Sequence, residues 1–393
     1  MMFKKRTNAK EAKELFLNSF QPISKIEDLP IEECDGRIIA ENITAKINVP
    51  HYRRAAMDGF AVMASETLGA GTGSPVILRL SDVIRRGTCV RVHTGSPMPQ
   101  GSDSVVMMED TALNGDKVEI FAQIHPFKNA GAIGEDVRKG EIILNEGRML
   151  RPCDIAVLAS LGIWKIKVFK RPLVVIIPTG EELVPRNKKN LGEGDVYETN
   201  GLMSAMYIRK WGGIPRLLDI VTDSPERIKE AIISNHDADM VITSGGTSVG
   251  KRDYVPAVVG SLGTLLVHGV GISPGKPTAL GMINNKPVIC MPGYPVAGIV
   301  ALFYFGKSAL RKLGRIPDEP ERIVRAVLSE KITGRTGYKT FSRVKIDNGM
   351  AVPLATMGAG ILSSVSKADG FVIIPENIEG RNAGEEVDVL LIE

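Results

Sequence analysis

The chain has 393 residues, 44% of them hydrophobic and 24% charged, and its 49 basic and 45 acidic side chains leave a net charge of +4. This composition excludes a disordered or fibrous protein, and the length predicts two to four globular domains. The aromatic residues are not interleaved with basic ones, so we expect no nucleic-acid partner.

The sequence gives no sign of a membrane span or a secretory leader. The most apolar stretch, 299–305, is far shorter than the roughly 20 residues that a span needs. The basic N-terminus has no apolar segment behind it. The four cysteines are far apart and form no metal-binding pattern with the five histidines. We therefore expect a cytoplasmic protein with reduced thiols and no membrane partner.

The first half of the chain begins with a predicted helix and continues with predicted strands. Apolar residues recur at helical spacing over 8–20, and Thr7 or Asn8 can cap the first turn. Short apolar runs follow at 60–63, 75–80, 89–94, 104–109 and 117–124, with an Asn-Gly-Asp hairpin signal at 114–116. These runs indicate a small β-rich unit. A helix and then a strand at 164–169 are expected after it.

Alternating strands and helices are expected over 171–318. The apolar runs are 173–180, 215–221, 239–246, 264–269 and 287–293, and the helical segments are 200–211, 225–235 and 296–313. This alternation indicates a parallel, doubly wound sheet covered on both faces. The last segment has short strands at 322–332, 338–346, 371–375 and 387–392, which indicate a small antiparallel barrel or sandwich.

Unusual sequences follow three of these strands, at 179–183, 243–254 and 291–295, and the last is preceded by a Ser-Pro-Gly-Lys-Pro turn at 273–277. Ligands of doubly wound sheets bind beyond the carboxyl ends of the strands, so all three should open onto one edge. Glycines in the loop 244–250 let backbone N–H groups approach an anion. Lys276, stiffened by Pro274 and Pro277, suits a phosphate or oxoanion contact.

Other interpretations of these loops are weaker. The spacing of Gly245, Gly250 and Lys251 resembles a P-loop, but Arg252 stands where Ser or Thr would hold Mg²⁺, which argues against an ordinary P-loop NTPase. The glycines at 269–275 resemble a dinucleotide fingerprint whose third glycine comes one residue late. A tight turn without a ligand and a solvated loop lysine at 276 stay open as structural alternatives.

Acidic residues form a second candidate group, at Asp58, Asp136, Glu182, Asp223 and Asp253. Mg²⁺ prefers carboxylate oxygens, water and substrate phosphate, and several acids near one phosphate loop fit that need. Three of these acids have a specific structural alternative: Asp58 and Asp136 in turns, and Asp223 at the cap of the helix that begins near Ser224 and Pro225. Thr94, a further candidate, has the same alternative of a turn.

Eight motifs occur in a characteristic order: MDGFAV, HTGSPMPQGSDSVVMMED, GEDV, TGEEL, YETN, TSGGTSVGKRDY, PGKP and MPGYPVAG. In this order and spacing they resemble the MoeA family, the molybdopterin molybdotransferases, whose eukaryotic relative is the gephyrin E domain. The resemblance covers nearly the whole chain. The TSGGTSVGKRDY segment is also similar to the MogA-type molybdopterin adenylyltransferases.

The resemblance implies a four-part molecule that combines α/β and β domains. A discontinuous N-terminal domain would take 1–44 and 140–170, a β-rich domain 45–139, a MogA-like doubly wound α/β domain 171–318, and a C-terminal β-barrel 319–393. The family is dimeric. Its reaction converts adenylylated molybdopterin and molybdate to molybdenum cofactor and AMP, with Mg²⁺.

The resemblance also implies residue roles, carried over by motif. The positions tied to activity are Asp58, Thr94, Asp136, Glu182, Asp223 and Asp253. The expected substrate-binding residues are Ser244, Gly245, Gly246, Thr247, Ser248, Gly250, Ser273, Lys276, Pro292 and Pro295. Mg²⁺ would be held by Glu182, Asp223 and Asp253.

Two departures from the family pattern leave the preferred oxoanion open. Ser273 stands where many bacterial members have a second lysine, and Tyr294 stands where Asn is frequent. Tungstate therefore remains an alternative to molybdate. Two other functions also stay open, MogA-type adenylyl transfer and a non-catalytic role as cofactor carrier or scaffold. A MogA-type adenylyltransferase is a further candidate partner.

Overall fold

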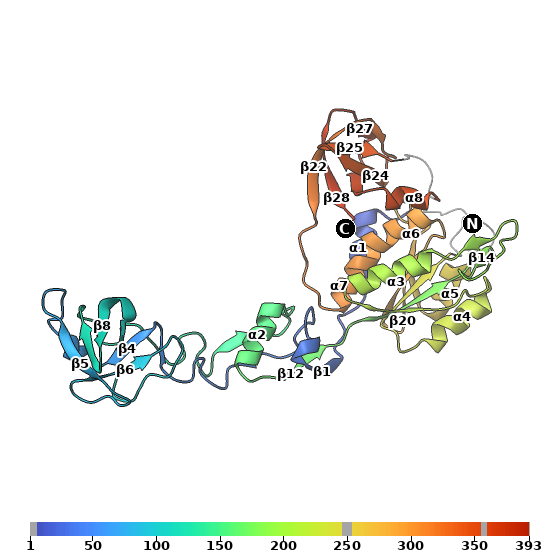
Figure 1. Ribbon diagram of the computed structural model, residues 1–393. Helices are drawn as coiled ribbons and strands as arrows, with labels where there is room; N and C mark the ends of the chain where they lie inside the picture. The colour runs from blue at the N-terminus through green and yellow to red at the C-terminus, as the bar shows by residue number, and fades with distance from the viewer. Residues whose placement is uncertain (1–5, 246–253, 355–359, 393) are drawn as a thin grey trace. The chain divides into compact units, whose positions relative to one another are not determined.

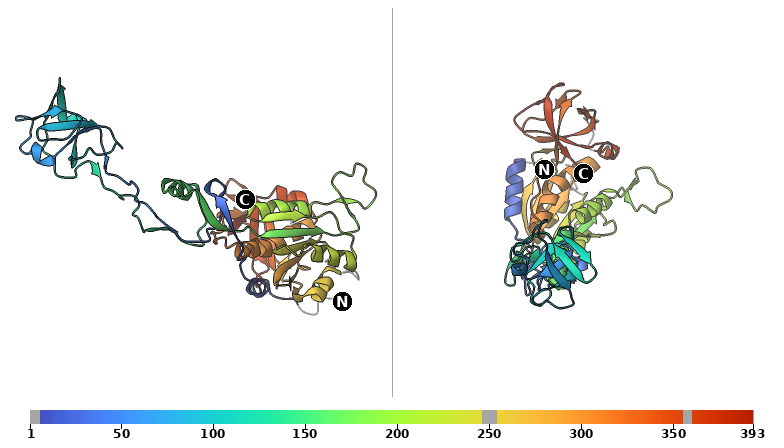
Figure 2. Two further views of the ribbon diagram at one scale, coloured as in Figure 1. Left: turned by 90° about the horizontal axis from the view of Figure 1, so that it is seen from below. Right: turned by 60° about the vertical axis from the view of Figure 1, so that its left-hand side comes forward.

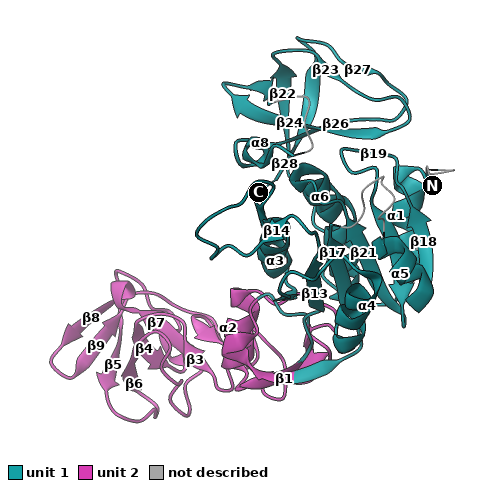
Figure 3. Cartoon of the chain, turned by 90° about the vertical axis from the view of Figure 1, so that its right-hand side faces the viewer, with its two compact units in different colours: residues 1–27, 36–38, 168–393 teal, residues 28–35, 39–167 magenta. Residues whose placement is uncertain are grey.

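The structure is a computed structural model that describes residues 6–245, 254–354 and 360–392. It divides into two compact units, which are coloured separately in Figure 3. Unit 1 comprises 1–27, 36–38 and 168–393, and unit 2 comprises 28–35 and 39–167. The predicted N-terminal domain, 1–44 and 140–170, has residues in both units, and the boundaries of the four predicted domains stay a prediction. None of the described helices is both long and apolar enough to cross a membrane.

Unit 2 is built around a six-stranded sheet in the order β7-β4-β6-β5-β9-β8. Its strands are β4 (Gly59–Val62), β5 (Val76–Leu80), β6 (Thr88–Val92), β7 (Ser104–Met107), β8 (Thr111–Asn114) and β9 (Lys117–Ile120). Phe60, Val106 and Ile120 are fully buried in its core, which confirms the predicted β-rich unit. The hairpin signal is also confirmed, because β8 and β9 pair on either side of Gly115, whose φ is +62°.

Shorter elements complete this part of the chain. They are β1 (Ile26–Pro30), η1 (Ile31–Glu33), β2 (Ile43–Thr44), β3 (Arg54–Ala55), η2 (Ala64–Thr67), η3 (Met108–Asp110), β10 (Ala130–Gly131), β11 (Ile142–Leu144), α2 (Pro152–Ser160) and β12 (Lys165–Phe169). Helix α2 and strand β12 correspond to the helix and strand that the sequence predicts over 150–170.

Unit 1 contains a second six-stranded sheet in the order β16-β13-β17-β21-β20-β18, of which Figure 3 labels β13, β17, β21 and β18. Its strands are β13 (Leu173–Pro178), β16 (Ile214–Leu217), β17 (Met240–Ser244), β18 (Thr264–His268), β20 (Ala279–Ile283) and β21 (Lys286–Met291). The first four in this order are parallel, as predicted. Strand β20 runs antiparallel to both of its neighbours, β21 and β18, which differs from the expected all-parallel sheet. A two-residue turn at Asn284 and Asn285, both with positive φ, joins β20 directly to β21 as a hairpin.

Helices cover both faces of this sheet. Alternate residues of β13 point to opposite faces, and each set is buried in a different cluster. Val174 and Ile176 belong to one buried cluster, which includes residues of α1 (Ala9–Asn18), α3 (Asn200–Lys210) and α7 (Lys307–Leu313). Val175 and Ile177 belong to another, with residues of α4 (Pro225–Ser234) and α5 (Tyr254–Leu262). The doubly wound α/β fold is therefore confirmed.

Local capping signals set the helix ends. The Asn8 side chain accepts hydrogen bonds from the backbone of Lys10 and Glu11, as expected for the cap of α1. Helix α6 (Pro295–Ala301) begins at a proline and runs through a π-helical turn, η4 (Leu302–Gly306), into α7. Two short strands, β14 (Leu183–Val184) and β15 (Val196–Tyr197), precede α3.

The C-terminal strands, red in Figures 1 and 2, close into a five-stranded barrel. The ring runs β24 (Lys339–Asp347), β25 (Met350–Pro353), β22 (Ile323–Leu328), β28 (Glu386–Leu391), β26 (Gly370–Ile374) and back to β24. The pairing of β26 with β24 closes the ring and so decides for the barrel over the sandwich. The remaining elements are β19 (Ile272–Ser273), β23 (Ile332–Thr333), α8 (Leu362–Ser366) and β27 (Gly380–Arg381).

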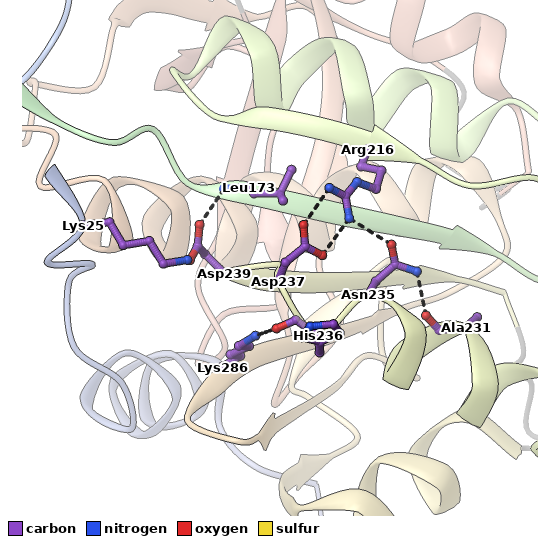
Figure 4. Close-up of polar contacts among 9 residues, drawn as sticks. All are labelled: Lys25, Leu173, Arg216, Ala231, Asn235, His236, Asp237, Asp239 and Lys286. Atoms are coloured by element: carbon purple, nitrogen blue, oxygen red, sulfur yellow. Dashed lines mark hydrogen bonds and ion pairs between the residues drawn. The ribbon is translucent and has the colours of Figure 1, made fainter. Parts of the chain in front are cut away.

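A polar network fastens the amino ends of the sheet strands in unit 1 (Figure 4). Asp239, only 9% exposed, accepts hydrogen bonds from the Leu173 backbone N–H at 2.9 Å and from Lys25 Nζ at 2.8 Å. Next to it, Arg216 makes a bidentate ion pair with Asp237, in which each guanidinium nitrogen donates to one carboxylate oxygen at 2.8 Å. Asp239 therefore ties the start of β13 and the N-terminal segment to the start of β17.

Replacing Asp239 with alanine should destabilise unit 1 by about 1–3 kcal/mol, because the half-buried N–H of Leu173 loses its acceptor. Hydrogen exchange at the amides of β13 measures this loss. Asp237→Ala is the matched control and should have a smaller effect, because its ion pair with Arg216 is half exposed to water. Equal protection of the Leu173 amide in both variants would contradict the proposed role of Asp239.

Candidate active site

The carboxyl ends of three sheet strands meet at one edge of unit 1, as the sequence predicts. The Thr179 N–H, just after β13, donates to the Ser244 carbonyl at the end of β17, at 2.9 Å. The Gly245 N–H donates to the Met291 carbonyl at the end of β21, at 3.2 Å. The loops that follow β13, β17 and β21 therefore start side by side.

Glycine is required at Gly245 because the backbone there is both left-handed and crowded. Its φ is +107°, and a Cβ atom would overlap the Thr179 carbonyl oxygen. Ser244, before it, is buried. The other predicted members of this loop, Gly246, Thr247, Ser248 and Gly250, lie outside the described residues, as does Asp253.

Asp223 faces this edge from the loop before α4. The Thr179 hydroxyl donates to Asp223 Oδ1 at 3.2 Å, although 44 residues separate the two in sequence. The alternative role at the helix cap belongs to Ser224, whose side chain accepts from the Arg227 N–H. Glu182 is exposed on the loop after β13. Its carboxylate folds back over Gly180: both oxygens lie within 3.0 Å of the position that a Cβ on Gly180 would take.

Ser273 and Lys276 lie on the segment between the sheet strands β18 and β20, which contacts the barrel through β19. Ser273, in β19, pairs in parallel with Thr340 of the barrel strand β24. Gly275 has a φ of +125°, and a Cβ there would lie 3.5 Å from the Ala297 carbonyl oxygen in the first turn of α6. The same helix begins at Pro295, so this segment reaches the loop after β21.

Pro292 is buried in the loop after β21, and Pro295, half-buried, follows that loop as the first residue of α6. Tyr294, at the departure from the family pattern, is 68% exposed. The loop is held by Asn200, whose Nδ2 donates to the Gly293 carbonyl at 2.7 Å. Asn200 is 8% exposed, and its buried Oδ1 has no hydrogen-bond partner. Sequence reasoning did not select Asn200 as a site residue; its place in the YETN motif was the available signal.

The remaining predicted positions belong to unit 2. The Thr94 N–H and hydroxyl both donate to Asp58 Oδ1, at 2.6 Å and 2.9 Å. These two hydrogen bonds, the backbone one foremost, lower the pKa of Asp58 and keep its exposed carboxylate charged. Asp136 is exposed on another loop, where its backbone N–H donates to the Val49 carbonyl. Unit 2 thus brings Asp58 and Thr94 together.

Three family models match successive parts of the chain. They are described as the MoeA N-terminal region (domain I and II), over 7–162, the "Probable molybdopterin binding domain", over 175–312, and the MoeA C-terminal region (domain IV), over 325–392. Together they extend from the first described helix to the last strand of the barrel.

Individual relatives are similar over nearly their full lengths. A Methanocaldococcus jannaschii protein assigned to molybdopterin biosynthesis is 38% identical over 94% of this chain and 92% of its own. The molybdopterin molybdenumtransferase of Haemophilus influenzae is 31% identical over 93% and 94%. The crystal structure of a molybdopterin biosynthesis MoeA protein from Pyrococcus horikoshii superposes with a TM-score of 0.82, at 33% identity, over 98% of this chain and 100% of that one.

Proposed function

Because the chain belongs to the MoeA family, we propose that it is a molybdopterin molybdenumtransferase, an enzyme of molybdenum cofactor biosynthesis. The observation that carries this proposal is the convergence of the loops after β13, β17 and β21 at one edge of a fold that matches the family throughout. That edge is where a doubly wound sheet binds its ligand.

The proposed reaction takes adenylylated molybdopterin and molybdate and releases AMP as the metal enters the pterin dithiolene. The backbone at Ser244 and Gly245 and the loop after them would receive the substrate's pyrophosphate, since glycine leaves the N–H groups open to an anion. Lys276 would contact the phosphate or oxoanion through a charge-assisted hydrogen bond. Pro292 and Pro295 would shape the wall of the cleft, and Asn200 would fix that wall through Gly293.

The carboxylates at this edge suit Mg²⁺. In the described ranges, no cluster of three or more His, Cys, Asp or Glu side chains could enclose a metal. Mg²⁺ does not need such a cage, because it is commonly held by one or two carboxylates together with water and substrate phosphates. Asp223 and Glu182 would provide these oxygens, together with Asp253. When bound, Mg²⁺ would neutralise charge on the phosphoanhydride as it breaks.

The positions in unit 2 enter the proposal through their motifs. Asp58 would act as a charged carboxylate, oriented by Thr94, and Asp136 would contribute a second acidic group.

We also propose that the enzyme is a cytoplasmic homodimer and receives its substrate from a MogA-type adenylyltransferase.

Adenylyl transfer is the less favoured alternative, because the segment it shares with this chain lies within the middle family model, over 175–312. The N-terminal and C-terminal models, over 7–162 and 325–392, are described as MoeA regions. A carrier role does not account for the acidic residues at the sheet edge, because binding without catalysis does not require them.

The test measures AMP release from the purified chain supplied with adenylylated molybdopterin, Mg²⁺ and either molybdate or tungstate. We expect release that depends on the oxoanion, and the two arms identify the preferred one. Tight binding of the adenylylated compound without release would indicate a carrier. Formation of that compound from Mg-ATP and molybdopterin would instead establish adenylyl transfer.

A further inference from the structure

Three segments that are distant in sequence meet beside Lys276. The Thr7 N–H donates to the Gly269 carbonyl at 3.1 Å, and the Gly271 N–H donates back to the Thr7 carbonyl at 2.9 Å. The Lys339 N–H donates to the carbonyl of Gly271 at 2.8 Å. The turn that carries Ser273 and Lys276 is thus flanked by the N-terminal segment and by barrel strand β24.

Two arginines from these flanking segments stack on one tyrosine. The guanidinium carbons of Arg6 and Arg335 lie 4.4 Å and 4.5 Å from the centre of the Tyr338 ring. Tyr338 is 4% exposed, whereas both arginines are exposed to solvent. Gly337, with a φ of +77°, makes room for this arrangement, since a Cβ there would overlap the Arg6 guanidinium. Stacking on a fixed ring holds each charge in place.

The charged groups that act on Tyr338 are all positive. Burial raises the pKa of Tyr338, but the hydrogen bond from Arg6 and the charges of Lys276, Arg335 and Arg6 outweigh burial and lower it. Within 6–245, 254–354 and 360–392, neither Arg6 nor Arg335 forms an ion pair with a carboxylate. A bound anion would therefore meet guanidinium groups that need not first give up a carboxylate partner.

We propose that Arg6 and Arg335, which stack on Tyr338, extend the anion site formed by Lys276 and Ser273. Their charges set the affinity of this site for a tetrahedral dianion. This inference rests on the proposed function. The dianion is either the free oxoanion or a phosphate of the substrate, which share charge and shape. The two arginines supply positive charge beside a turn on which Lys276 is charged and Ser273 is not.

The experiment titrates the full-length protein with molybdate, tungstate and AMP in separate calorimetric series, at two salt concentrations. The variants are Arg6→Gln, Arg335→Gln and the double variant. Arg325→Gln is the matched control, because Arg325 is an exposed barrel arginine paired with Asp388 on β28. Lys276→Gln tests the site of the proposed function, and Arg6→Lys with Arg335→Lys keeps the charge if the glutamine variants are poorly folded.

We expect the double variant to lose about tenfold or more in affinity for the anion, with a weaker salt dependence, while Arg325→Gln binds as the unmodified chain does. A loss with molybdate or tungstate assigns the arginines to the free oxoanion, and a loss with AMP alone assigns them to a substrate phosphate. If Lys276→Gln weakens binding but the arginine variants do not, the inference is wrong and the proposed function stands. If the unmodified chain binds none of the three anions, the proposed anion site itself fails.

Discussion

Replacing Gly245 with alanine should reduce oxoanion-dependent AMP release by roughly 100-fold, the loss that about 1 Å of misplacement in an active site can cause. The φ of +107° at this position costs a residue with a Cβ about 1–3 kcal/mol. The added Cβ would also overlap the Thr179 carbonyl oxygen. The loop after β17 would have to move away from β13, and the contact between Thr179 and Asp223 would move with it.

Steady-state AMP release, compared with thermal unfolding, separates the two consequences of this substitution. Gly349→Ala is the control, since Gly349 also has a positive φ, +79°, but a Cβ there would meet nothing within 4 Å. The control should lose some stability and keep its activity. A Gly245→Ala protein that turns over at the normal rate would show that this strand end does not shape the active site.

Replacing Lys276 with glutamine should weaken binding of the adenylylated substrate by roughly 10- to 150-fold, the range that corresponds to the loss of one hydrogen bond to a charged group. Glutamine keeps much of the length of the side chain and a polar end, so the change mainly removes the positive charge. Because the substrate and the oxoanion are both anionic, we expect a higher KM for each.

Direct binding measurements and KM values check this prediction. Lys286→Gln is the control, because Lys286 begins β21 and contacts the His236 carbonyl at the opposite edge of the same sheet (Figure 4). It should leave both KM values unchanged. Unchanged affinity and turnover in Lys276→Gln would remove Lys276 from the proposed site and leave the contact to another group.

Some features of the site could be predicted because they are local. Pro225 and Ser224 mark the start of α4, and Asn8 marks the start of α1, since capping depends on side chains within one turn. Apolar runs flanked by helices predicted strands buried on both faces. The position of the site then follows from a general property of such sheets, whose parallel strands end at one edge.

Other features could not be predicted because they depend on which distant segments pack together. Asp223 had a local alternative at the helix cap, and its contact with Thr179 across 44 residues appears only in the folded chain. Asn200 reaches Gly293 across 93 residues. The direction of β20, antiparallel to both β21 and β18, follows from the two-residue turn that joins it to β21, and its apolar composition alone does not reveal that direction.

The sequence by itself therefore determined the family, most of the strands and helices in their order, and the loops that carry the candidate chemistry, but neither α5 nor β20 was predicted. These depend on hydrophobic period, on turn residues and on motif order, which are properties of short segments. Only the tertiary structure decided the closure of the barrel, the partners of Asp223 and Asn200, and the meeting of Arg6 and Arg335 on Tyr338. Those contacts join segments far apart in the chain, and packing and hydrogen-bond geometry select them from many pairings that the same local patterns allow.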